Sequence, residues 1–167
     1  MQHFDLCVIG SGSGNAVATK EFADRSVAIV DGAPWFGGTC LSAGCIPSKM
    51  LAYPADVAEV ARHGAALGID VPRVQVRWPE LRERVLNRVD RSAEAAERQR
   101  ERHARVTVFR DQASFVGQKR LLVGEDVLLS ADQFVVAAGS RPRVPDLPGI
   151  EDPAVLGGHR LGVGEPL

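Results

Sequence analysis

Two cysteines, Cys40 and Cys45, are separated by four residues at the entry to a predicted helix, where their thiols could do redox chemistry. Such spacing at a helix start can bring two Cα atoms within the roughly 4.4–6.8 Å that a disulfide requires, and Gly44 allows the chain to bend between them. The positive end of a helix also stabilises a thiolate. We therefore predict a catalytic dithiol that exchanges with a disulfide substrate and needs a two-electron carrier, a requirement that a flavin meets.

A metal centre is the main alternative for closely spaced cysteines. Only Cys7 remains as a further thiol ligand, and His63, the nearest downstream histidine, has no ligand motif around it. A structural zinc site takes four protein ligands. We therefore predict no metal site and interpret Cys7, which lies inside an apolar run, as a buried packing residue.

A glycine-rich loop precedes the two cysteines and contains Gly10, Gly12 and Gly14. Backbone N–H groups and a helix end in such a loop can face the pyrophosphate of a dinucleotide. Asp31 follows 21 positions after Gly10, close to the roughly 20-residue separation at which a carboxylate binds the adenosine ribose through its free 2′-hydroxyl. Asn15 is a departure from the motif, because it occupies the position of the third glycine.

The elements around this loop predict the fold class. An apolar run over 4–9 is followed by a segment of helical composition over about 14–23 and by a second apolar run over 27–30. A strand, a crossover helix and a second strand imply parallel pairing with a right-handed connection. We therefore predict an α/β fold with a Rossmann-like, doubly wound parallel sheet.

The rest of the chain predicts longer helices and short strands. We expect two helical pieces over 45–62, interrupted near Pro54. One long helix is expected over 79–103, with Pro79 in its first turn and one apolar stripe that includes Val85, Val89 and Ala93. The charges at 97–105 favour a solvated helix face over a phosphate-binding patch. Five short strands should follow, at 106–109, 114–116, 120–123, 127–129 and 133–137. Several of them should form a small antiparallel meander. The last should be buried on both faces and return to the parallel sheet.

Composition limits the partners. The chain has 167 residues, of which 45% are hydrophobic and 25% charged, and a net charge of −1, so one globular core is expected without a basic field for nucleic acid or membranes. Its first residues lack the charged lead and apolar core of a secretory signal, and no apolar run reaches membrane-spanning length. We predict a soluble, cytoplasmic protein with a small-molecule partner.

The stretch 37–49, Gly-Gly-Thr-Cys-Leu-Ser-Ala-Gly-Cys-Ile-Pro-Ser-Lys, closely resembles the redox-active disulfide motif of the pyridine nucleotide-disulfide oxidoreductases. The resemblance implies that Cys40 attacks the substrate, that Cys45 faces a flavin, and that Lys49 lies near the flavin's reactive nitrogen. It also places Gly38 and Thr39 among the cofactor-binding residues.

The later stretch 135–142 resembles the segment that closes the first FAD portion in this family, with Ala138 in place of a common threonine and Gly139 at the cofactor. The resemblance implies electron flow from NAD(P)H through FAD to a Cys40–Cys45 disulfide and then to a disulfide substrate. The segments 12–15, 68–70 and 76–78 are most similar to a branch that reduces a low-molecular-weight disulfide. A dihydrolipoamide dehydrogenase-like or another disulfide substrate is the alternative.

The resemblance covers only the first part of the family's chain. We predict an incomplete FAD-binding and redox-disulfide domain over 1–148 and a divergent tail, rich in proline and glycine, over 149–167. The family is homodimeric, and its NAD(P)H and dimerisation domains, with their His–Glu acid–base pair, are expected to be absent here. The isolated chain is therefore expected to be inactive. It could instead be a nucleotide-binding or dimerising module that uses the long helix after Pro79, or a remnant without function.

Overall fold

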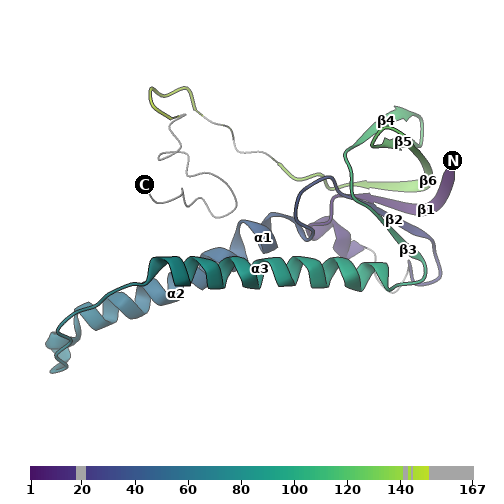
Figure 1. Ribbon diagram of the computed structural model, residues 1–167. Coiled ribbons are helices and arrows are strands. Elements are labelled where there is room, and N and C mark those ends of the chain that lie inside the picture. The colour runs from purple at the N-terminus through teal and green to yellow at the C-terminus, as the bar shows by residue number, and fades with distance from the viewer. Residues whose placement is uncertain (18–21, 141–142, 144, 151–167) are drawn as a thin grey trace.

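The computed structural model describes residues 1–17, 22–140, 143 and 145–150. A six-stranded mixed sheet forms its centre, with strand order β3-β2-β1-β6-β5-β4 (Figure 1). The first four strands in this order pair in parallel, and β6, β5 and β4 continue as an antiparallel meander. The strands are β1 (Gln2–Ile9), β2 (Val27–Val30), β3 (Val106–Phe109), β4 (Ala113–Gly117), β5 (Arg120–Val123) and β6 (Val127–Val136). The predicted α/β fold with a Rossmann-like parallel sheet is confirmed.

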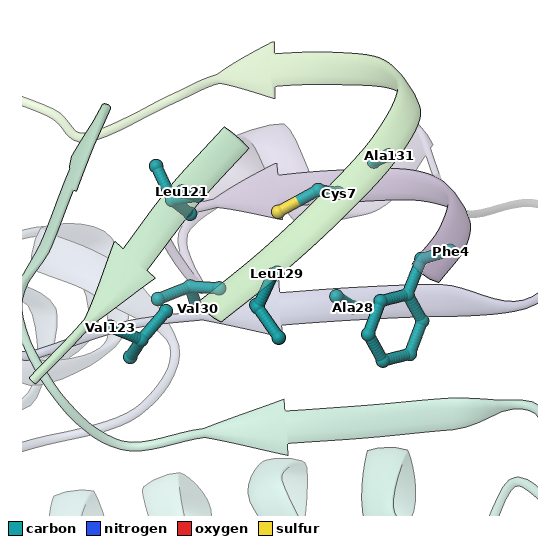
Figure 2. Packing of buried hydrophobic residues seen from close by; sticks show 8 residues of the cluster. All are labelled: Phe4, Cys7, Ala28, Val30, Leu121, Val123, Leu129 and Ala131. Atoms are coloured by element: carbon teal, nitrogen blue, oxygen red, sulfur yellow. The ribbon is translucent and has the colours of Figure 1, made fainter. Parts of the chain in front are cut away.

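The central strands are buried on both faces. On one face, Leu6 and Val8 of β1 pack with Phe36 and with the partly buried Ala96 of the long helix. On the other face, the meander folds over the sheet and buries Cys7 among apolar side chains (Figure 2). Burial raises the pKa of Cys7 to about 11, because an apolar surrounding disfavours the thiolate. Cys7 is therefore a packing residue, as its place in an apolar run indicates.

The two strands predicted over 127–129 and 133–137 are one continuous strand, β6, so that prediction is wrong. Pairing with β1 extends from Gln2 opposite Leu129 to Ile9 opposite Val136. Because β1 is long, its backbone hydrogen bonds keep the polar residues in the middle of β6 in the strand. The predicted burial of its end on both faces is also wrong, since Val136 is 68% exposed and no described element covers it.

The helices are the 3-10 helix η1 (Ser13–Val17), α1 (Gly38–Ser42), α2 (Cys45–Arg62), the 3-10 helix η3 (Gly64–Leu67) and α3 (Trp78–Glu101). The helix predicted over 14–23 thus begins as a 3-10 helix, and its residues 18–21 lie outside those described. The two predicted pieces over 45–62 are one helix with Pro54 inside it. Proline removes one helical hydrogen bond. Ala58, one turn after Pro54, is buried where α2 packs against α3, and this packing stabilises the helix on the far side of the proline.

The two long helices form an arm that extends away from the sheet (Figure 1). The second half of α3 lies along β3, and α2 runs beside its first half. Val85, Val89 and Ala93 are buried on α3, which confirms its predicted apolar stripe. Within the described ranges, no helix combines the length and apolar character needed to cross a membrane.

Candidate functional site

A cleft of about 480 Å³ opens where the carboxyl ends of β1 and β2 meet the end of β6. Open α/β sheets bind ligands at this edge, and the volume is in the range of small-molecule sites. The cleft brings together seven of the residues that the sequence singles out, namely Gly10, Gly12, Asp31, Gly38, Thr39, Cys40 and Gly139. The three others, Gly14, Cys45 and Lys49, are not among its lining residues.

The glycine loop is pressed against the end of β6. Gly10 has a φ of 110°, and a Cβ there would lie 2.2 Å from the carbonyl oxygen of Ala137. A Cβ on Gly14 would lie 2.1 Å from the Cβ of Ala137. In the usual motif the third glycine allows the helix to pack closely on the strand. Here Gly14 allows this close packing, against Ala137 directly after β6. Asn15 is buried, and its Oδ1 has no hydrogen-bond partner among the described residues.

The glycine loop also touches the loop that carries the cysteines. A Cβ on Gly38 would lie 2.5 Å from the Cα of Gly12, so the two backbones are in direct contact. The backbone N–H of Gly37 donates a hydrogen bond of 2.7 Å to Oγ of the buried Ser11. The predicted pyrophosphate loop and the predicted dithiol are therefore parts of one structure.

Asp31 lies at the start of the loop that follows β2. Its Oδ2 accepts the backbone N–H of Ser11 at 2.8 Å, and its Oδ1 accepts the backbone N–H of Ala33 at 2.7 Å. Each carboxylate oxygen has a further lone pair, so both can accept a hydroxyl from a ligand in the cleft. The carboxylate is thus oriented by the glycine loop on one side and by its own loop on the other.

The two thiols come together across a short turn. Cys40 lies in α1, Cys45 is the first residue of α2, and the backbone N–H of Ala43 bonds the carbonyl of Thr39 at 2.9 Å between them. A Cβ on Gly44 would lie 3.0 Å from that same carbonyl oxygen, which explains the glycine at the bend.

In the structure both Cys40 and Cys45 are exposed thiols. A hydrogen bond with the Cys45 side chain raises the pKa of Cys40 above its ordinary value, with smaller contributions from burial and from charge repulsion between the two sulfurs. Mutual contact of this kind is what a dithiol needs to interconvert with a disulfide. Lys49 is exposed one turn after Cys45 on the same helix.

Sequence reasoning missed Arg110, which lies directly after β3. Its guanidinium donates to the backbone carbonyls of Asp31, Ala33 and Pro34 and forms an ion pair with Glu97 of α3. Glu97 lies in the charged run interpreted as a solvated helix face, and that interpretation is wrong for this residue, whose side chain is 25% exposed. Its place depends on strand order: β3 neighbours β2, and residues that follow neighbouring parallel strands share a sheet edge.

Comparison with known proteins gives two findings. Residues 4–163 match the family model described as pyridine nucleotide-disulphide oxidoreductase. The chain is also similar to mycothione reductases of Mycobacterium tuberculosis from strains CDC 1551 / Oshkosh and ATCC 25618 / H37Rv, each 38% identical over 150 residues that cover 87% of this chain and 32% of the relative. The chain therefore spans about a third of the length of these curated relatives. The family match continues past residue 148, and the domain division predicted there stays a prediction.

Proposed function

Because the chain belongs to the pyridine nucleotide-disulphide oxidoreductase family, we propose that it is the FAD-binding and dithiol part of a disulfide reductase that draws its electrons from NAD(P)H. One observation carries the proposal. The glycine loop, Asp31 and Cys40 line a single cleft, and the Gly12–Gly38 contact joins the nucleotide-binding part to the thiol part.

The residues of the cleft suit an FAD. Asp31 would accept the ribose hydroxyls of its adenosine, and the backbone N–H groups around Gly12 would face its pyrophosphate. A Cβ on Gly38 would clash with the backbone of Gly12, so the absence of this Cβ allows the two loops to meet and form one wall of the cleft. When bound, FAD supplies a two-electron carrier between a nicotinamide nucleotide and the dithiol. By family resemblance, Gly139 lies at the cofactor and Lys49 near its reactive nitrogen.

The thiols would act in order. The thiolate of Cys40 attacks one sulfur of the substrate disulfide, forms a mixed disulfide and releases one thiol. The Cys45 thiolate then attacks the Cys40 sulfur and releases the second thiol, leaving a Cys40–Cys45 disulfide. The two protons of the dithiol pass to the two released thiols. Two electrons and one proton from NAD(P)H, with a second proton from solvent, would then restore the dithiol. Family resemblance assigns the first role to Cys40 and the second to Cys45, and both thiols are exposed.

For the substrate we propose mycothione, the disulfide of mycothiol. Similarity to two proteins named mycothione reductase supports it, as do the segments 12–15, 68–70 and 76–78, which resemble that enzyme. A dihydrolipoamide dehydrogenase-like substrate is the alternative. Like its family, the whole protein would act in the cytoplasm as a homodimer.

A second candidate function is a nucleotide-binding or dimerising module without catalysis. An exposed apolar surface favours it, in which Tyr53, Val60 and Leu67 are 73%, 67% and 76% exposed and line or border a groove of about 520 Å³. This surface belongs to α2 and η3 and not to the long helix after Pro79. Nucleotide binding without thiol-dependent redox chemistry would favour the module.

The test is the visible spectrum of the purified chain after addition of FAD, before and after anaerobic reduction. The expected result is bound flavin with a long-wavelength thiolate band after two-electron reduction. Cys45→Ser should lose this band, because Cys45 is the thiol assigned to the flavin, whereas the matched variant Cys40→Ser should show it without reduction. Bound flavin with no thiolate band in any of the three proteins would overturn the proposed dithiol chemistry.

A further inference from the structure

The side chain of Arg110 holds the loop after β2 from outside. Arg110 donates from Nη1 to the carbonyl of Asp31 at 3.1 Å, and from Nη2 to the carbonyls of Ala33 at 2.7 Å and Pro34 at 3.2 Å. A guanidinium carries five N–H donors in a rigid, planar fork. It can therefore bridge several backbone carbonyls at once, which a lysine ammonium cannot do in the same geometry.

Arg110 is itself held in place. Its Nε lies 2.9 Å from Oε1 of Glu97, and its guanidinium lies over the ring of Phe36 at 5.8 Å from the centroid. The side chains of Arg110 and Glu97 are 30% and 25% exposed. By contrast, the ion pairs of His3, Arg62, His63, Arg77 and Arg98 join side chains that are more than half exposed. Exposed pairs contribute little, but a short and shielded pair fixes geometry.

Four of the five guanidinium donors are thus engaged by the loop carbonyls and Glu97. This leaves Arg110 poorly placed to bind a phosphate, and Glu97 balances its charge. Ala33 links the arginine to the carboxylate, because its carbonyl accepts from Arg110 while its N–H donates to Oδ1 of Asp31.

We propose that Arg110, fixed by Glu97, is a positioning residue that sets the loop of Asp31 so that its carboxylate meets the 2′-hydroxyl of an adenosine ribose. This inference rests on the proposed nucleotide site. It assigns recognition of the ribose 2′-hydroxyl in part to a contact between α3 and the sheet edge, outside the cleft itself. Arg110 acts through the loop and does not touch the ligand.

The experiment compares the affinities of the full 167-residue chain for ADP and 2′-deoxy-ADP by calorimetry. The wild-type chain should prefer ADP by about tenfold, since the lost hydrogen bond to a charged group is worth about 1.4 kcal/mol or more. Arg110→Met should reduce the preference to about twofold, and Arg110→Lys should lie between the two. Arg98→Met is the matched control, because Arg98 forms an exposed pair with Glu94 on the same helix, and it should leave the preference unchanged.

The outcomes separate the two proposals. Asp31→Asn should abolish the preference, and failure of the wild-type chain to prefer ADP would overturn the ribose site and the inference with it. If the wild-type and Asp31→Asn chains behave as expected but Arg110→Met keeps the full preference, the positioning role is wrong and the nucleotide site stands. Should Arg110→Met not fold, Arg110→Lys and Glu97→Gln decide the question, and an unchanged preference in both would overturn the role.

Discussion

Replacing Gly38 by alanine should damage the contact between the nucleotide loop and the dithiol loop. Gly38 has a φ of 71°, and a Cβ built on it would lie 2.5 Å from the Cα of Gly12. The atoms that this Cβ would meet all belong to the backbone of Gly12, so no flexible side chain can move away. Gly68 provides the matched control, because its φ of 77° is similar and a Cβ there has nothing within 4 Å.

The two substitutions share one cost and differ in the other. A left-handed conformation costs a non-glycine residue about 1–2 kcal/mol. Forcing an extra methyl group into a packed contact costs about 1–3 kcal/mol more. Gly68→Ala should therefore lower the free energy of unfolding by about 1–2 kcal/mol, and Gly38→Ala by about 2–5 kcal/mol. Only Gly38→Ala should also weaken nucleotide binding, because only it separates the two loops.

Urea unfolding measures the stabilities, and calorimetric titration with FAD or ADP measures the affinities. Equal destabilisation by the two substitutions would refute the backbone contact as an energetic feature of the site. A loss of stability at Gly38 with unchanged affinity would show that the contact supports the fold without shaping the cleft.

The remaining predictions concern titrating groups. Cys45→Ala should lower the pKa of Cys40 toward its ordinary value, because it removes the hydrogen bond that raises it, so alkylation of Cys40 should begin at lower pH; an unchanged pH profile would contradict this. Cys7 should react with a thiol reagent only after unfolding, since it is buried with a pKa of about 11, whereas the other two thiols react at once. Hydrogen bonds from Ser26 lower the pKa of Asp5 in the folded state. The contribution of Asp5 to stability should therefore be present above its unfolded-state pKa and be lost as the pH falls through its lowered folded-state pKa. Asp5→Asn should make the free energy of unfolding less dependent on pH in this acidic range.

Local signals identified much of the fold. The strands at 27–30, 106–109 and 120–123 have the bounds that the sequence predicts, because short apolar runs between turn residues define them without help from distant parts of the chain. The long helix α3 is similarly marked by Pro79 at its start and by one apolar stripe. Errors occurred where a distant partner outweighs a local signal, as at Pro54 beside α3 and in the polar middle of β6 beside β1.

The candidate site divides in the same way. By itself, the sequence determined which groups can do chemistry, since the cysteine spacing, the glycine loop and Asp31 depend on neighbours in the chain. Only the tertiary structure decided how they meet: the contact of Gly12 with Gly38, the packing of Gly14 on Ala137, and the hold of Arg110 on the Asp31 loop. These contacts join residues that are 26, 123 and 79 positions apart in the sequence. Such contacts depend on strand order and register, and long-range pairing sets both.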